Sequence, residues 1–424
     1  MLNRQTTRNW YPDAPYADFP RTEFADRIER TRKLMEEQHL DLLVLWDKTN
    51  IRYYTGYHSI HWHALSIQPA VFLLPIDREP VLIVPEFFRG VAEGLTYIGD
   101  IRGQMDPHCT EKIRELPDDV AAAVKDLKCE SGRIGTEAGR LGGMTVPRPI
   151  NDIDRFRAGL PDAAWVEAAD LIWRCRMIKS PLEVDAISRA TSAVVSALGK
   201  LVASFRLGMT EREVGIILQD VLIRQAHDID AMNVRCTQHR YPMPDTPPFY
   251  DGVTISEGDR MVVEPIPMYK GYCGSCCRTF QVGPLSEEAK KSVRIIERSQ
   301  AAAIAAIRPG VTTGEVVGVV EDVFRDEGSP IEIEMIGHGM GLTGHEPPML
   351  TAREDTVIEE GMVFAVEIWK YDVSGFAYGD AEQATKNLGP FGNEDLVVVT
   401  KDGCDRLPAF RKDILSLPFG SSRG

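Results

Sequence analysis

The chain lacks an uninterrupted apolar run of roughly the 18 residues that a membrane-spanning helix requires. Its N-terminus, MLNRQTTRNWYPDAPY, has no apolar core and no cleavage-like site, so we expect no secretory signal. Basic residues are in deficit, because 48 Lys and Arg stand against 63 Asp and Glu, for a net charge of −15. A surface of that sign is unsuited to nucleic acid and to anionic membranes. We therefore expect a cytoplasmic protein that binds neither.

Cysteine is sparse as well, with eight in 424 residues, which excludes a disulfide scaffold. Three of the eight, Cys273, Cys276 and Cys277, cluster in GYCGSCCRTF. A CxxC pair can bind zinc, but a zinc ribbon needs a second pair, and the sequence has none. The cluster therefore predicts small apolar side chains packed in a strand.

The chain contains an internal repeat. GDRMVVEP, with Glu264, resembles EGMVFAVEI, with Glu367, and the two glutamates are 103 residues apart. The preceding segments match at a spacing of 102, since RLGMTERE around Gly208 resembles RPGVTTGE around Gly310. Such self-similarity predicts two equivalent halves folded on each other. One carboxylate from each half would face its twin, and like charges held together need a metal, a shared proton or a cationic ligand.

Periodicity and breakers predict two domains. Strands alternating with helices up to about residue 171 indicate an N-terminal α/β domain over residues 1–171. The C-terminal domain, residues 172–424, is predicted to be α+β, with each half running helix, helix and then strands. Ser180 before Pro181 predicts the start of a long helix. Thr210 with Glu213, and Thr312 with Glu315, predict capping boxes at equivalent helices of the two halves.

Several motifs, in this order, resemble the creatinase/prolidase/methionine aminopeptidase superfamily, which has the "pita-bread" fold. They are RMIKSPLEVDAISRA, GYCGSCCRTFQVG, GHGMGLTGHEPP, EGMVFAVEIW and NEDLVVVT. The N-terminal TNIRYYTGY pattern extends the resemblance to the creatinase and prolidase branch, over nearly the full length. The resemblance implies an N-terminal creatinase-like domain and a C-terminal pita-bread domain with an internal pseudo-twofold repeat.

In the peptidases of this superfamily, two aspartates, one histidine and two glutamates bind a pair of divalent metals. The resemblance places the first aspartate on Glu264 and the second, which bridges both metals, on Ser275. It places the histidine on His338 and the glutamates on Glu367 and Glu394.

Two differences between this chain and the superfamily pattern bear on the cofactor. A serine cannot supply the bridging carboxylate, and the upstream histidine of the superfamily falls here on Pro247. We therefore expect that no cofactor is bound and no dinuclear centre forms. The alternative is one divalent ion (Mn, Zn, Fe or Co) on the remaining ligands, Glu264, His338, Glu367 and Glu394.

The acidic cluster predicts a small cationic or zwitterionic substrate. Glu264 and Glu367 would hold the cation through charge-assisted hydrogen bonds, and His338 would move the proton. Creatinase and ectoine hydrolase, which the chain resembles, imply cleavage of a C–N bond in a nitrogen compound. His345 is carried over from the peptidases as a substrate contact. Trp369, where peptidases commonly have a small residue, would narrow the pocket and also contact substrate.

The segment YHSIHWHALS resembles a lid that, in creatinase-like dimers, reaches into the partner subunit's pocket. Trp62 would stack on a planar cation, and His61 or His63 would replace the missing upstream histidine. A surface turn with ordinary packing is the alternative. The resemblance thus implies a homodimer whose N-terminal domain contributes to the partner's active site.

Three other functions stay open from the sequence. One is a metal-dependent Xaa-Pro dipeptidase or aminopeptidase. Another is a dimethylsulfoniopropionate lyase, which keeps the aspartates that this chain lacks. The third is a non-catalytic pita-bread module that binds partners, as some relatives of methionine aminopeptidase do.

Overall fold

The chain folds into two compact units, unit 1 (Met1–Arg176) and unit 2 (Met177–Gly424). The computed structural model describes residues 13–62, 70–104, 116–137, 148–236, 254–329, 335–370, 391–412 and 416–417. The predicted division after residue 171 lies inside helix α7, which spans Ala169–Met177.

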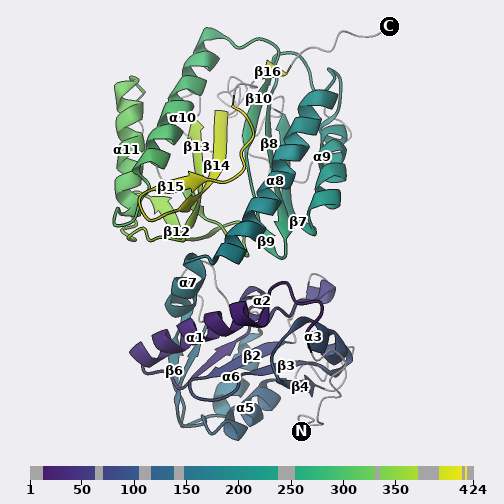
Figure 1. Cartoon of the computed structure of the whole chain (residues 1–424), viewed down its shortest axis with the longest axis vertical. Coiled ribbons are helices and arrows are strands. Elements are labelled where there is room, and N and C mark those ends of the chain that lie inside the picture. The colour runs from purple at the N-terminus through teal and green to yellow at the C-terminus, as the bar shows by residue number, and fades with distance from the viewer. Residues whose placement is uncertain are drawn as a thin grey trace. The chain divides into compact units, whose positions relative to one another are not determined.

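Unit 1 is an α/β structure around a sheet of order β4-β3-β2-β1-β5-β6 (Figure 1). Its strands are β1 (Leu42–Leu45), β2 (Val71–Pro75), β3 (Val81–Pro85), β4 (Asp100–Gln104), β5 (Arg133–Thr136) and β6 (Ala164–Glu167). Its other helices are α1 (Arg21–Glu37), α2 (Lys48–Thr55), α3 (Arg89–Leu95), α5 (Leu116–Asp126) and α6 (Ile150–Ala158), with short 3-10 turns η1 (Ile60–Trp62) and η2 (Glu86–Phe88). The predicted α/β class of this unit is confirmed.

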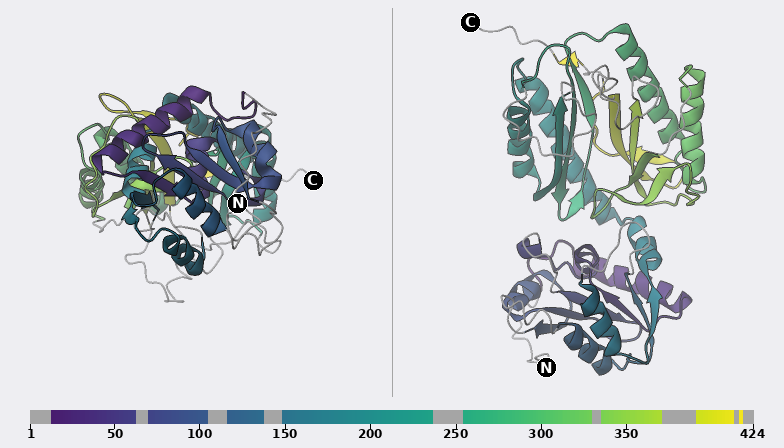
Figure 2. Two further views of the ribbon diagram at one scale, coloured as in Figure 1. Left: turned by 90° about the horizontal axis from the view of Figure 1, so that it is seen from below. Right: turned by 180° about the vertical axis from the view of Figure 1, so that it is seen from behind.

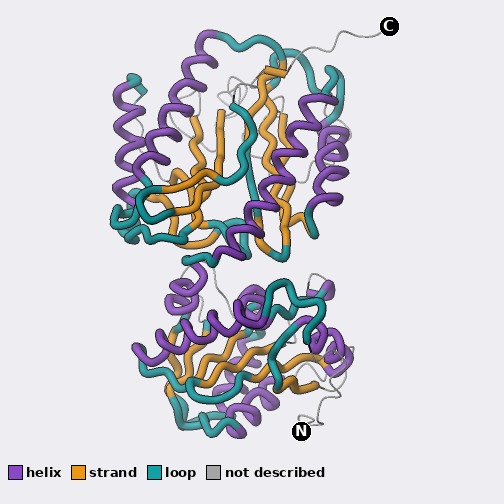
Figure 3. Tube along the Cα trace, viewed as in Figure 1, coloured by secondary structure: helices purple, strands orange, loops and turns teal. Residues whose placement is uncertain are grey.

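The apolar sequence of strand β1 is explained by the central, buried position of this strand in the sheet of unit 1. Strand β1 pairs with β2 antiparallel and with β5 parallel, and every residue of β1 is buried. A strand covered on both faces reads as a continuous apolar run rather than an alternating one. Figure 3 shows this sheet with helices around it.

Unit 2 contains a sheet whose main path runs β12-β11-β13-β14-β10-β8-β7. Its strands are β7 (Asp228–Cys236), β8 (Arg260–Tyr269), β9 (Tyr272–Cys273), β10 (Arg278–Val282), β11 (Met335–Gly339), β12 (Glu346–Thr351), β13 (Val363–Lys370), β14 (Phe391–Val399), β15 (Cys404–Arg406) and β16 (Ser416–Leu417). Its helices are α8 (Pro181–Ser204), α9 (Glu211–Gln225), α10 (Glu287–Ala306) and α11 (Thr313–Asp326). Seen from behind, the strands of unit 2 lie between the two helix pairs (Figure 2).

The repeat seen in the sequence is present in the hydrogen bonds of unit 2. Gly208 N–H donates to Ile255 O at 3.0 Å, and Gly310 N–H donates to Ile358 O at 2.9 Å. Both glycines have positive φ, 87° and 89°, which only glycine adopts without strain. The two halves therefore share one backbone design, in which a left-handed turn pairs with the segment before the glutamate-bearing strand.

The predicted capping boxes are formed at α9 and α11. The Thr210 hydroxyl accepts from Glu213 N and the Thr312 hydroxyl accepts from Glu315 N. Each glutamate carboxylate in turn accepts from the backbone N–H of its threonine. We expect Thr210→Ala and Thr312→Ala each to lower the free energy of unfolding by about 1 kcal/mol. Urea unfolding followed by circular dichroism measures this. Ser196→Ala, on the exposed middle of α8, is the control and should change stability by less than about 0.5 kcal/mol; equal losses in all three variants would contradict the capping role.

Helix α8 is long and apolar enough to cross a membrane by length and composition, although charged residues such as Asp185 and Arg189 interrupt its sequence. It is the one such helix among the described residues. Val194, Leu198 and Leu201 on its apolar face are buried in the core of unit 2. A mostly buried core helix meets the same length and composition test.

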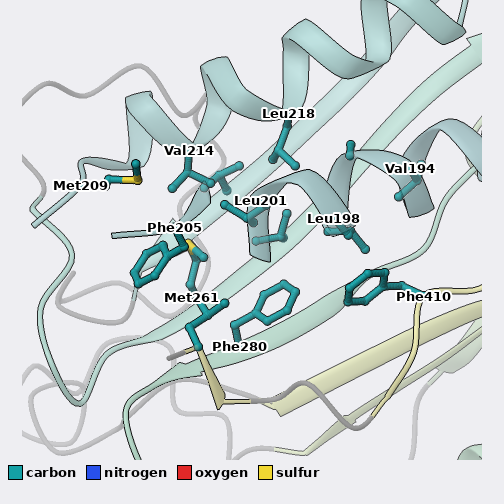
Figure 4. Close-up of a cluster of buried hydrophobic side chains, with 14 of the residues drawn as sticks. Val194, Leu198, Leu201, Phe205, Met209, Val214, Leu218, Met261, Phe280 and Phe410 are labelled. Atoms are coloured by element: carbon teal, nitrogen blue, oxygen red, sulfur yellow. The ribbon is translucent and has the colours of Figure 1, made fainter. Parts of the chain in front are cut away.

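Each half of unit 2 has its own apolar core. In the first half, α8 packs on β8 and α9 packs on α8 and β7, and Leu198, Leu218, Met261 and Phe280 belong to one buried cluster (Figure 4). In the second half, α10 packs on β13 and β14, and α11 packs on α10 and β12, in a matching cluster. The halves join where β10 pairs with β14. The predicted glutamates come from strands close to this join.

Candidate active site

His338 lies on β11 and is 3% exposed. The glycines on either side of it are required by neighbouring strands. A Cβ at Gly337 would lie 1.9 Å from Ala365 O, and one at Gly339 would lie 2.7 Å from Glu346 O. The His338 Nδ1 atom is 3.0 Å from Gly339 O, which makes Nδ1 the protonated nitrogen. Its Nε2 atom then carries the lone pair and lies 3.9 Å from Glu367 Oε2.

Glu367 and Glu394 are directly opposite each other on the antiparallel strands β13 and β14. Glu394 is 1% exposed, and its Oε2 atom accepts from Ser275 Oγ at 2.5 Å and from Cys277 N at 3.1 Å. The Glu394 N–H in turn donates to Cys277 O at 3.1 Å. Ser275 follows Gly274, which has no side chain and so lets this segment pack closely on α8. A Cβ at Gly274 would lie 2.3 Å from the backbone N of Thr191.

Glu264, from β8, belongs to the other half of the repeat. Its Oε2 atom accepts from Asn233 Nδ2 at 2.8 Å, and Asn233 is its register partner on β7. No motif in the sequence pointed to Asn233, because its role depends on strand pairing alone.

The carboxylates perturb one another strongly. Burial first, and then the Glu264 carboxylate, raise the pKa of Glu367 to about 8. Burial, followed by Glu367 and Glu264, raises the pKa of Glu394 well above its ordinary value. Burial, with the neighbouring His345 imidazole, lowers the pKa of His338 to about 4, so this imidazole is neutral at pH 7. Negative charge is therefore poorly tolerated here unless something positive balances it.

His345 is brought to this cluster by a turn whose contacts were not predicted from the sequence. The exposed His345 ring stacks on His338 with centroids 3.9 Å apart. The next residue, Glu346, is 1% exposed; it accepts from Thr343 N at 3.1 Å and pairs with Lys179 Nζ at 3.3 Å. The buried ion pair thus organises the turn that carries His345. The adjacent HE in GHEPP and the lysine of IKSP were the only sequence signals of it.

The remaining predicted substrate contacts belong to different units, with Trp369 in unit 2 and Trp62 in unit 1. Trp369, on β13, is half-buried: its indole hydrogen-bonds Glu367, and its ring covers Gly392. Trp62 lies in unit 1, is 8% exposed and packs edge-to-face on Tyr57. His63 lies outside the described residues, as does the side chain of His61.

Cys273, Cys276 and Cys277 are fully buried, and none forms a disulfide. Cys276 packs among apolar side chains in the core cluster of the first half, as expected, but it lies between β9 and β10 rather than in a strand. Burial, together with the three site glutamates, raises the pKa of the Cys277 thiol, so it stays protonated beside them.

Family models match both units of the chain. The model of the Creatinase/Prolidase N-terminal domain matches residues 27–178, and that of Metallopeptidase family M24 matches residues 185–401. The chain belongs to metallopeptidase family M24. It is therefore a hydrolase that acts on C–N bonds, and the predicted resemblance to the creatinase/prolidase superfamily is confirmed.

Known M24 proteins resemble the chain over most of its length. A probable dipeptidase PepE from Mycobacterium tuberculosis is 30% identical over 273 residues, which cover 62% of this chain and 68% of that protein. An Xaa-Pro dipeptidase from Lactobacillus delbrueckii subsp. lactis is 24% identical, with 92% of this chain and 99% of the relative covered. The structure of an Xaa-Pro dipeptidase from Bacillus anthracis superposes with a TM-score of 0.75 at 24% identity, covering 93% of this chain and all of that one. The predicted two-domain pita-bread architecture is thereby confirmed.

Membership of a metallopeptidase family overturns the expectation that no cofactor is bound. That expectation was wrong because it gave the loss of one ligand, at Ser275, more weight than the ligands that are kept. The donor set suits a divalent cation, since three interacting carboxylates and a neutral imidazole with a free Nε2 lone pair are metal ligands. In the part of the chain that the structure describes, no three His, Cys, Asp or Glu side chains surround one point as they stand. The residues fit a metal in kind.

Proposed function

We propose that the chain is a divalent-metal-dependent dipeptidase that cleaves Xaa-Pro dipeptides. The observation that carries this proposal is the placement of Glu367 opposite Glu394, with His338 Nε2 3.9 Å from Glu367 Oε2. Buried carboxylates in this arrangement need a cation. Several relatives that cover 92% of the chain are Xaa-Pro dipeptidases, which supports the choice of substrate.

Glu264, His338, Glu367 and Glu394 would hold the metal. When bound, a divalent ion in such a site polarises water and the substrate carbonyl. The protein residues around it supply position and hydrogen bonds. Asn233 orients the Glu264 carboxylate, and Ser275 with the Cys277 N–H orients that of Glu394. The exposed His345 ring, stacked on His338, would donate to the substrate from the solvent side.

The pocket wall favours a short substrate. Trp369 places an indole beside Glu367, where its ring covers Gly392. A ring in this position leaves less room for residues beyond a dipeptide. Stacking of Trp62 on substrate from a partner subunit stays a prediction, as does the replacement of the missing upstream histidine by His61 or His63. The homodimer and the cytoplasmic location also stay predictions.

Metal removal tests this proposal. Protein dialysed against a chelator should lose hydrolysis of Ala-Pro, and Mn²⁺, Co²⁺ or Zn²⁺ added back should restore it by at least about 10²-fold. Proline release is the measurement, and Ala-Ala is the matched substrate, which should be cleaved more slowly. If the protein loaded with each of these ions released no proline from Ala-Pro, the proposal would be wrong.

A creatinase- or ectoine-hydrolase-like C–N hydrolase is the second candidate, because Glu264 and Ser275 both depart from the peptidase ligands. A panel of creatine-like, ectoine-like and sulfonium compounds, assayed with the same metal-loaded protein, separates it from the first. Turnover of a cationic compound without proline release from Ala-Pro would favour this candidate or, for the sulfonium compound, the lyase. Capture of a stable protein partner together with no turnover would favour the binding module.

A further inference from the structure

Three of the proposed metal ligands lie on adjacent strands. His338, Glu367 and Glu394 come from β11, β13 and β14, which are consecutive in the sheet. Glu367 faces Glu394 in register and lies 3.9 Å from His338 Nε2. One imidazole and two carboxylates, with open positions for water or substrate, are a complete set of protein ligands for a single catalytic ion.

The other side of the site is poorer in ligands. Only Glu264 and the shared Glu394 could serve a second ion there, and Glu264 Oε2 already accepts from Asn233 Nδ2 at 2.8 Å. Two carboxylates, one of them shared, fall short of the three protein ligands that a catalytic ion usually has. The residue that would complete the set is at position 275, where the side chain is a neutral hydroxyl.

The Ser275 hydroxyl is bonded to the Glu394 oxygen atom that a second cation would otherwise bind. Its hydroxyl donates to Glu394 Oε2 at 2.5 Å, and the Cys277 N–H donates to the same oxygen at 3.1 Å. Ser275 is 0% exposed, so water does not compete for this bond. A hydroxyl whose proton is committed in this way cannot bridge two ions as a carboxylate does.

We propose that the site holds one divalent ion, on His338, Glu367 and Glu394, and that Ser275 determines this number. On this inference Glu264 is not a ligand of that ion, and its carboxylate, oriented by Asn233, is left for the substrate. The inference rests on the metal dependence in the proposed function, and it does not depend on which substrate is cleaved.

Counting ions tests the proposal. Chelator-treated protein is equilibrated with MnCl₂, desalted and analysed by elemental mass spectrometry. We expect about one Mn²⁺ per wild-type chain and about two per Ser275→Asp chain, because aspartate restores the bridging carboxylate. Ser275→Asn has the shape of aspartate without its charge and should stay at about one. Two ions or none in the wild type would overturn the proposal, as would one ion in a folded Ser275→Asp chain.

The electron paramagnetic resonance spectrum gives a second readout that needs no variant. Wild-type protein with excess MnCl₂ removed should show an isolated Mn²⁺ ion, and a spin-coupled pair would refute the proposal even if Ser275→Asp failed to fold. In Ser275→Asp, the added buried carboxylate beside Glu394 should make thermal stability depend on Mn²⁺ more steeply than in Ser275→Asn. One bound Mn²⁺ with no cleavage of Ala-Pro would leave this inference standing while the proposed function fails.

Discussion

Replacing His338 with alanine should lower kcat/KM for Ala-Pro by about 10²-fold or more, with the fold unchanged. The physical reason is that its neutral Nε2 is the one imidazole lone pair directed at the buried carboxylates of the described site. Glu264→Gln keeps the hydrogen bond from Asn233 but removes a charge, so it should cost about as much. Proline release at saturating Mn²⁺ over a range of Ala-Pro concentrations separates kcat from KM.

His227→Ala is the matched control for His338→Ala. His227 belongs to the same unit, is exposed, and packs on Tyr269 with the two rings tilted by 39°. Its loss should leave turnover within a factor of about two. His345→Ala should act mainly on KM, because its ring is exposed and stacks on His338 from outside. Wild-type turnover in both His338→Ala and Glu264→Gln would show that this cluster is not the active site.

Replacing Arg278 with methionine should lower the free energy of unfolding of unit 2 by about 3–5 kcal/mol. Its guanidinium is buried and donates to Asp395 Oδ1 at 2.6 Å, to Glu394 O at 2.7 Å and to Phe410 O at 2.5 Å. These bonds connect β10 to β14, where the two halves of the repeat join. Methionine would leave the fully buried Asp395 with Arg406 and Lys412, each 3.5 Å away.

The control for this prediction is Arg189→Met. Arg189 also forms an ion pair, with Asp185 at 2.8 Å, but both side chains are more than half exposed. An exposed pair of this kind contributes about 0.5 kcal/mol. A double variant, Arg278→Met with Asp395→Asn, should recover part of the loss because it removes the buried carboxylate that has lost its hydrogen-bonded guanidinium. Urea unfolding provides the comparison, and a loss below about 1 kcal/mol in Arg278→Met would contradict the role of Arg278 at the join.

Local signals were enough to predict the elements that frame the site. Capping boxes at Thr210 and Thr312 depend on residues three positions apart, and both are formed. The repeat also depends on short-range turns, and its two glycines adopt the same left-handed conformation. Such features are predictable because each one is decided within a few residues of chain.

The expectation that no metal is bound failed because a metal site depends on residues that are distant in the sequence. Ser275 and the missing upstream histidine at Pro247 suggested that the ligand set was incomplete. The chain nevertheless belongs to a metallopeptidase family and keeps His338, Glu367 and Glu394 on adjacent strands. The roles of Asn233, Lys179 and Glu346 could not be predicted, because each contacts a partner that is distant in the sequence. Asn233 and Glu264 are 31 positions apart, and Lys179 and Glu346 are 167 positions apart.

By itself, the order of amino acids determined the two-part organisation, the duplicated half and the identity of the acidic and imidazole side chains, since these depend on pattern and near neighbours. Only the tertiary structure decided which oxygen each donor satisfies, that Ser275 binds Glu394, and that a buried Lys179–Glu346 pair supports the turn carrying His345. Those outcomes depend on strands that are distant in the chain lying side by side, where burial makes each unbalanced charge costly.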